Sequence, residues 1–279
     1  MVYLIYNPLA CGGNGEERKN HALEEIQHIY PNIKEVVFTQ TDINFFKNLL
    51  KDDILILVGG DGTLNTFVNL YKDYATRNKC YLYKGGSGND FLRDVESNET
   101  LTLINPYLDN IPYVVTNGTK KFFMNNVGFG LDGETCVIAD RKKAKGKLKV
   151  NYSNIAISLL LAKYKKRNAR VIVDGKEYIF KNVWIASTMN GRFYGGGMKS
   201  APNQKRTSNT LTLIVIHGWS RLSILFKFSK IFKGTHIKYK RNVTLLEGKN
   251  IKVFFDIPCG LQYDGESVIK SDHYSAYKE

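Results

Sequence analysis

One stretch decides the fold of this chain: Leu57-Val58-Gly59-Gly60-Asp61-Gly62-Thr63-Leu64-Asn65. An apolar run, Ile54–Leu57, leads into it, and apolar residues at helical spacing follow it through Leu70. A buried strand that breaks at glycines and restarts as a helix presents unpaired backbone N–H groups and a partial positive charge to an anion. An acid at Asp61 suits a phosphate site when a divalent metal or a hydroxyl group lies between carboxylate and phosphate. The stretch therefore predicts nucleotide-dependent phosphoryl transfer.

The composition, with 43% hydrophobic and 24% charged residues, is that of an ordinary globular protein. The length of 279 residues suits one large or two medium domains. The first apolar run, Val2–Tyr6, is too short for a signal peptide and reads as a strand. The longest apolar helical stretch, Ile155–Ala162, falls far short of the roughly 20 residues that span a bilayer. Four scattered cysteines without a CxxC pair indicate neither disulfides nor zinc. We expect a cytoplasmic protein.

The formal net charge of +14 is concentrated in the second half of the chain. The basic clusters lie at Arg141–Lys149, Lys163–Arg167 and Lys227–Arg241, the last with phenylalanines interleaved. Any one cluster is more simply a solvated face, but three together favour a polyanionic partner. Lysine beside Phe and Leu fits an anionic membrane surface, and no nucleic-acid-binding motif is present. We therefore expect peripheral membrane association and no nucleic acid partner.

The first part of the chain alternates short apolar strands with helices, which predicts a parallel α/β sheet. The expected strands are Val2–Tyr6, Ile33–Phe38, Ile54–Val58 and Cys80–Tyr83. Glycine-bearing loops follow three of them, at Asn7–Gly15, Gly59–Thr63 and Gly85–Asp90. Ligands bind at the carboxyl ends of strands in such sheets, so these loops are expected to converge on one crevice.

The second part predicts a mostly antiparallel β-sandwich domain with inserted helices. Asp174-Gly175 between two alternating runs is a strong hairpin signal. The expected strands are Phe122–Asn126, Val171–Val173, Glu177–Phe180, Val183–Thr188, Leu211–Ile216, Ile237–Tyr239, Val243–Leu245 and Ile251–Phe255. The domain division is placed at 1–115 and 116–279, within a soft boundary at 110–118. An unpaired edge strand of the second domain could mediate a homodimer.

Two further motifs carry polar groups after expected strands. Gly85–Phe91 contains Asn89 and Asp90, which could bind hydroxyls or a hydrated metal, or cap a short helix. Asp264-Gly265-Glu266 is a common turn sequence on its own. It gains weight from the first motif, because phosphoryl transfer needs a carboxylate that accepts the proton of the attacking hydroxyl.

These motifs, in order and rough spacing, resemble the diacylglycerol kinase catalytic-domain family of bacterial lipid kinases. Stretches at Asn125–Gly130 and Gly195–Pro202 resemble that family too, so the resemblance covers nearly the whole chain. It implies an N-terminal ATP-binding domain, a C-terminal β-sandwich, and an active site in the cleft between them. It also implies transfer of the γ-phosphate of ATP, with Mg²⁺, to a lipid hydroxyl.

The resemblance assigns roles to individual residues. Glu266 matches the family's proton acceptor, and Asp264 lies beside it as an orienting or alternative base. From the glycine motif itself, we expect Asp61 to place metal or phosphate. The residues expected around ATP are Asn7, Pro8, Leu9, Ala10, Cys11, Thr39, Gly59, Gly60, Asp61, Gly62, Thr63, Leu64, Asn65, Thr66, Ser87, Asn89 and Asp90.

Two departures from the family pattern stand out. Many bacterial members carry Asp-Gly-x-Leu-Asp after the Ala-Pro pair, and its first aspartate holds a structural magnesium. The matching stretch here, Ser208–Thr212, contains neither acid, which leaves only Ser208 and nearby carbonyls as ligands for a weaker ion. The tail after Glu266 is also short for a strand or helix that returns to the first domain.

Two rival functions remain open from the sequence. NAD kinases also use Gly-Gly-Asp-Gly-Thr, so a kinase acting on a soluble substrate is the nearest enzymatic alternative. A non-catalytic lipid-binding regulator of the same fold is the other alternative, which the missing acids at Ser208–Thr212 favour and the retained acids elsewhere oppose.

Overall fold

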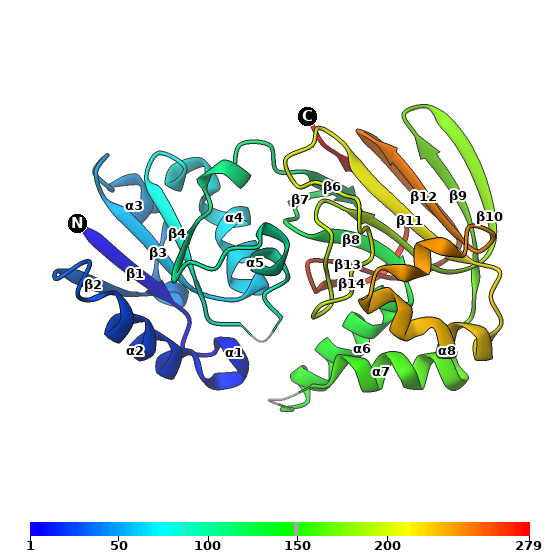
Figure 1. The fold of residues 1–279 in the computed structure, drawn as a ribbon, viewed down its shortest axis with the longest axis horizontal. Coiled ribbons are helices and arrows are strands. Elements are labelled where there is room, and N and C mark those ends of the chain that lie inside the picture. The colour runs from blue at the N-terminus through cyan, green and yellow to red at the C-terminus, as the bar shows by residue number, and fades with distance from the viewer. Residues whose placement is uncertain (87, 148–149) are drawn as a thin grey trace. The chain divides into compact units, whose positions relative to one another are not determined.

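The chain forms two compact units, residues 1–109 and 110–279, in a computed structural model that describes residues 1–86, 88–147 and 150–279 (Figure 1). The division expected after residue 115 cuts through a strand of the second unit, β6 (Tyr113–Thr116). That strand pairs within the second sheet, so it belongs with the later residues.

The first unit is an α/β domain built on one sheet of five strands in the order β2-β1-β3-β4-β5. The first four strands are parallel and β5 is antiparallel to β4, which confirms the predicted parallel α/β architecture. Its elements, with η for short 3₁₀ segments, are β1 (Val2–Tyr6), α1 (Ala10–Gly13), α2 (Gly15–Ile26), β2 (Ile33–Val37), η1 (Phe38–Gln40), α3 (Ile43–Lys47), β3 (Ile54–Gly59), α4 (Asp61–Ala75), β4 (Lys79–Lys84), α5 (Asp90–Val95), β5 (Leu101–Leu103) and η2 (Asn105–Tyr107).

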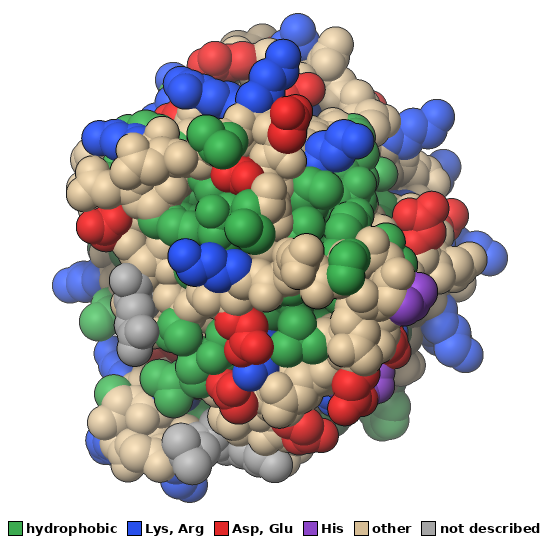
Figure 2. Space-filling model, turned by 90° about the vertical axis from the view of Figure 1, so that its left-hand side faces the viewer, with side chains coloured by type: hydrophobic (Ala, Val, Ile, Leu, Met, Phe, Trp, Pro, Cys, Tyr) green, Lys and Arg blue, Asp and Glu red, His purple; other side chains and the backbone are tan. Residues whose placement is uncertain are grey.

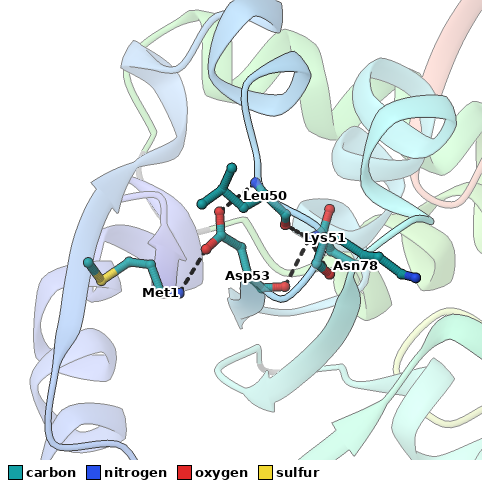
Figure 3. A network of polar contacts seen from close by, with 5 residues as sticks. All are labelled: Met1, Leu50, Lys51, Asp53 and Asn78. Atoms are coloured by element: carbon teal, nitrogen blue, oxygen red, sulfur yellow. Dashed lines mark hydrogen bonds and ion pairs between the residues drawn. The ribbon is translucent and has the colours of Figure 1, made fainter.

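A polar network at the amino ends of β3 and β4 fastens that edge of the first sheet (Figure 3). The Asp53 carboxylate pairs with the Met1 amino group at 2.7 Å and accepts the Leu50 N–H at 2.8 Å. The side-chain amide of Asn78 donates to the carbonyls of Leu50 and Asp53 at 2.6 and 2.9 Å. Although burial opposes the shift, these hydrogen bonds hold the pKa of Asp53 below its usual value. The opposite, carboxyl edge carries the glycine loops.

The second unit is a mostly antiparallel β domain with inserted helices, as predicted. It holds a sheet of nine strands, and its last strand, β14, lies beside β13 and β6. Its elements, with η3 a π-helical segment, are β6 (Tyr113–Thr116), β7 (Thr119–Phe122), β8 (Asn126–Gly130), α6 (Leu131–Ala144), α7 (Tyr152–Ser158), η3 (Leu159–Lys163), β9 (Arg167–Val173), β10 (Lys176–Met189), β11 (Leu211–His217), α8 (Arg221–Phe232), η4 (Thr235–Lys238), β12 (Val243–Gly248), β13 (Asn250–Tyr263) and β14 (Glu266–Tyr277).

Two long strands, β10 and β13, close this sheet around a core. Each of them pairs with β8 along one part and with β9 along another, so the four strands form a closed circuit. Apolar side chains from these strands, such as Phe129, Phe180 and Leu261, fill the space that they enclose. A second apolar cluster joins α6, α7, η3 and α8 to Trp184 of β10 and Ile214 of β11.

Two sequence predictions of local structure are wrong. The segment Phe122–Asn126, expected as one strand, is instead the end of β7, a connection at residues 123–125 and the start of β8. The N–H groups of Met124 and Asn125 in this connection donate to a carboxylate. Ile237–Tyr239 overlaps the 3₁₀ segment η4, whose His236 is fully buried. The tail after Glu266, which the sequence analysis describes as short for a return to the first domain, belongs to β14 and pairs within the second sheet. No helix within the described ranges is both long and apolar enough for a membrane span.

Candidate active site

The three glycine-bearing loops of the first unit meet at the carboxyl edge of its sheet, as the sequence predicts. The backbones of Gly60 and Gly86 touch, since a Cβ on Gly86 would lie 2.5 Å from the Cα of Gly60. Gly85 N–H also donates to Gly59 O at 3.0 Å. Any side chain at Gly60 or Gly86 would force the loops after β3 and β4 apart. Glycine here is a packing requirement as well as an opening toward a ligand.

Asp61 ties these two loops together. Its Oδ2 and Oδ1 atoms accept the backbone N–H groups of Asp90 and Phe91, each at 2.9 Å. These are the first residues of α5, so the carboxylate caps a helix that belongs to the other loop. The first helical bond of α4 runs from Leu64 N–H to Gly60 O, so the N–H groups of residues 61–63 precede the ladder of that helix.

Asn89 and Asp90 have structural partners inside the same loop. Asn89 is left-handed (φ 49°), and its side-chain oxygen accepts Gly86 N–H at 3.1 Å while its amide donates to Gly86 O. Asp90 is buried and pairs with Arg93 at 2.6 Å. Asn89 therefore closes the loop and does not cap α5 with its side chain, a task that Asp61 performs. Ser87, also expected at the nucleotide, lies outside the described residues.

The loop after β1 joins the same edge. The thiol of Cys11 donates to Gly85 O at 2.6 Å, which links the first glycine loop to the third. Burial raises the pKa of Cys11, so the thiol is a poor nucleophile at neutral pH. Asn7 accepts Leu9 N–H at 2.9 Å, Ala10 N–H donates to Asn7 O, and Pro8 O accepts Gly15 N–H at 3.2 Å.

The remaining residues expected around ATP differ in exposure. Leu64 and Asn65 are buried in α4, so the Leu64 side chain packs the core. Thr63 packs over Gly59, and Thr66 donates to Gly62 O at 3.0 Å, inside the same helix. Thr39 is exposed in η1, and in the described part of the chain its side chain makes no hydrogen bond to the glycine loops.

In the second unit, Asp264 and Gly265 form a two-residue hairpin turn between β13 and β14, and Glu266 follows as the first residue of β14. Asp264 is left-handed (φ 46°), and its carboxylate accepts the backbone N–H groups of Met124, Asn125 and Asn126, the last two at 2.7 and 3.0 Å. Glu266 is exposed, and its carboxylate has no hydrogen bond or ion pair to any described residue. Asp264 thus positions the turn, and Glu266 is the carboxylate available for chemistry.

A half-buried acid that the sequence analysis left without a role, Asp132, is linked to this turn. Its Oδ2 atom accepts the Ser187 hydroxyl at 2.6 Å and the Gln262 amide at 3.4 Å. Gln262 also accepts Gly265 N–H at 3.0 Å, so it links Asp132 to the turn that carries Glu266. Burial raises the pKa of Asp132 to about 6, although hydrogen bonds from Ser187, Gly133 and Gln262 oppose the shift. The sequence signal that could have indicated Asp132 is its position directly after the run Gly128-Phe129-Gly130-Leu131.

The resemblance implies two magnesium ions, one bound with ATP and one structural. Magnesium bound to ATP is held mainly by phosphates and water, so it needs no preformed cage of carboxylates, and Asp61 at the glycine loops fits it. Among residues 1–86, 88–147 and 150–279, no group of three His, Cys, Asp or Glu could hold a further ion. The stretch Ser208–Thr212 therefore does not fit a structural magnesium.

Comparisons with known proteins agree with both units. Residues 1–110 match the model of the diacylglycerol kinase catalytic domain, and residues 125–273 match that of the YegS C-terminal NAD kinase beta sandwich-like domain. A protein of Mycobacterium tuberculosis strain H37Rv named diacylglycerol kinase is 24% identical over 253 residues, which cover 85% of this chain and 80% of the relative. A crystal structure titled as a diacylglycerol kinase from Bacillus anthracis strain Sterne has the same fold, with a TM-score of 0.66 and 20% identity over 99% of this chain and 93% of that one.

Proposed function

Because the chain belongs to the diacylglycerol kinase catalytic-domain family, we propose that it transfers the γ-phosphate of ATP to the hydroxyl of diacylglycerol or a related lipid. One observation carries the proposal. In the first unit, Asp61 joins the second and third glycine loops and Cys11 joins the first loop to the third. The second unit presents an exposed carboxylate, Glu266, beside a turn that Asp264 holds.

ATP would bind at the glycine loops of the first unit. The backbone N–H groups of residues 61–63, at the start of α4, would donate to its phosphates, and the helix dipole would add partial positive charge. Asn7–Cys11, Thr39, Gly59 and Asn89 would surround the rest of the nucleotide. Magnesium, when bound with ATP, neutralises charge on the phosphates. Asp61 keeps the two loops at the spacing that this cradle needs.

The acceptor lipid would bind at the second unit. Its hydroxyl oxygen attacks the γ-phosphorus, the bond to the bridging oxygen breaks, ADP leaves, and the hydroxyl proton passes to Glu266. Asp132, linked through Gln262 to the Glu266 turn, would contact polar groups of the acceptor. Transfer requires both units to act on one phosphate. The active site in a cleft between the two units, which the family resemblance implies, is part of this proposal.

An anionic membrane is the proposed source of the acceptor. Residues 141–246 contain 24 of the 40 lysines and arginines but only two of the 26 acids, Asp174 and Glu177, so the rest of the chain is net acidic. On the face that Figure 2 shows, by contrast, acidic and basic side chains are interspersed around an apolar area. The excess of positive over negative charge therefore comes from residues 141–246, within the second unit.

An exposed apolar ridge accompanies this charge. We define it as Leu222 and Phe226 of α8 with Ile157 and Leu161 of α7 and η3, whose exposed fractions are 67%, 77%, 40% and 59%. Helix α8 contacts η3, and α7 and α8 both lie below the strands of the second unit in Figure 1. Arg221 binds the two segments together by donating to the carbonyls of Leu160 and Tyr164 at 3.0 and 2.7 Å. Apolar side chains flanked by lysine suit the interface of an anionic bilayer.

The test is transfer of labelled γ-phosphate from ATP and magnesium to a bacterial lipid extract in mixed micelles, with NAD in a parallel reaction. Label in a lipid, lost with Glu266→Gln, is the expected result, and mass spectrometry then identifies the acceptor. Label in NAD alone would assign the chain to the soluble-substrate class. Label in neither, with ATP still bound, would favour the non-catalytic lipid-binding regulator.

A further inference from the structure

A single side-chain amide closes the loop 204–212, which precedes and enters β11. Gln204 is buried, with 5% of its surface exposed. Its Nε2 atom lies 2.9 Å from Thr210 O, 3.1 Å from Lys205 O and 3.3 Å from Ser208 Oγ. Its Oε1 atom accepts the Thr212 hydroxyl at 2.6 Å. One donor group is thus surrounded by three oxygen atoms of its own loop.

Three oxygens that converge on one positively polarised group form the environment expected around a small cation. The separations of 2.9–3.3 Å are those of N–H···O hydrogen bonds, whereas magnesium binds oxygen at about 2.0–2.1 Å. The stretch 204–212 contains no acid that could offset the charge of a divalent ion, and it includes two cations, Lys205 and Arg206. The amide supplies the attraction without the charge.

The same loop also supports the peptide that holds Asp264. Arg206 is buried and donates to Met124 O and, at 2.8 Å, to the side-chain oxygen of Asn125. Asp264 accepts the N–H groups on the other side of this peptide. Lys278 donates to Arg206 O and to the Asn190 side chain, both at 2.7 Å. Burial, with the nearby Arg206 charge, lowers the pKa of Lys278 to about 8.

We propose that Gln204 takes the place of a divalent cation in this loop, so that the second unit folds and holds the Asp264–Glu266 turn without a metal there. The inference goes beyond the proposed function, because it concerns what organises the loop and not what the site phosphorylates. The family pattern has aspartates at the positions of Ser208 and Thr212, and the proposal explains how this chain folds without them. The hydrogen-bonded amide of Gln204 then holds the loop oxygens together in place of a bound ion.

Thermal unfolding in the absence of ATP tests this. The wild-type melting temperature should be the same in EDTA and in millimolar magnesium, and native mass spectrometry should find the chain without a bound ion. Gln204→Glu should place a carboxylate among oxygens and lower the melting temperature in EDTA by about 5 °C. Magnesium or manganese should restore it. The matched control, Gln204→Met, keeps the length, loses both hydrogen-bonding functions, and should be destabilised equally with and without metal.

A wild-type melting temperature that falls in EDTA and recovers with magnesium would overturn the proposal, even if neither variant folds. So would a Gln204→Glu protein that matches wild type in EDTA, or one that metal does not restore. None of these readouts uses kinase activity, so a failure here and a failure of the proposed function are told apart.

Discussion

The Oδ1 atom of Asp61 lies 2.9 Å from the backbone nitrogen of Phe91, so a carboxylate at the start of α4 caps the helix that follows the neighbouring glycine loop. Both oxygens are used, because Oδ2 accepts the next N–H group, that of Asp90. Asparagine offers one acceptor oxygen and sets an NH₂ group against the other N–H. Asp61, at the centre of the motif, therefore holds two loops together and is also a candidate for metal or phosphate placement.

Asp61→Asn is expected to abolish phosphoryl transfer and to weaken ATP binding, since the two loops no longer hold their spacing. The lost hydrogen bond and the facing donors should also cost about 1–3 kcal/mol of stability. Calorimetric titration with ATP and urea unfolding measure the two effects. Asp73→Asn, an exposed acid of the same helix, is the control and should change neither. Normal turnover in Asp61→Asn would remove Asp61 from the site.

Glu266→Gln is expected to reduce turnover about 10²–10⁴-fold, the usual contribution of a general base, with ATP affinity unchanged. Stability should stay at the wild-type value, because the exposed carboxylate has no hydrogen bond or ion pair with the part of the chain that the structure describes. Steady-state kinetics and ATP titration check this against Glu247→Gln, an exposed acid of β12. Full activity in Glu266→Gln would require another proton acceptor.

Asp264→Asn should behave differently from the change at Glu266. Asp264 accepts three backbone N–H groups, so the amide should lose one or more of these bonds and lower both stability and turnover. Because each bond to a charged acceptor is worth about 1.5–3 kcal/mol, the melting temperature should fall clearly. A variant with wild-type stability and low turnover would contradict the positioning role and favour Asp264 as a base.

The first unit could be predicted largely from sequence because its signals are local. The apolar runs at Val2–Tyr6 and Ile54–Val58 are strands at those positions, and glycines mark the loops that follow them. The convergence of these loops also follows from the chain, since parallel strands end at one edge of a sheet. The capping of α5 by Asp61 could not be predicted from the sequence, because Asp90 and Phe91 are 29 and 30 positions away from Asp61 in the chain.

The second unit was less predictable because its decisive contacts are distant in sequence. Asp264 binds N–H groups 138–140 residues away, where the expected strand Phe122–Asn126 is interrupted between β7 and β8. Asp132 meets Ser187 across 55 residues, and this contact could not be predicted from the residues around Asp132. In η4, alternating apolar residues suggested a strand, but burial of His236 against Ser200 O favours a helical turn.

The raised pKa of Asp132 predicts a pH-dependent stability. The unfolded carboxyl titrates near pH 4 and the folded one at about 6, since burial disfavours the charged form. The folded state then binds more protons between these values, so stability falls as pH rises through this window and stays lower above it. Asp132→Asn should remove a difference on the order of 2–3 kcal/mol. Urea unfolding of both proteins from about pH 4 to pH 7 measures it, and parallel pH curves would contradict the assignment.

Phe226→Glu should weaken binding to vesicles that contain anionic lipid. The side chain is 77% exposed on α8, and losing its transfer into the bilayer interface while adding a negative charge should cost at least about tenfold in affinity. Binding of the wild type should fall with added salt and with loss of the anionic lipid. Ile179→Glu is the matched control, because Ile179 is 62% exposed on β10 and lies outside the ridge. Equal vesicle binding by the two variants would contradict a membrane role for α8. A wild-type dimer that Phe226→Glu converts to a monomer would assign the ridge to a second copy of this chain.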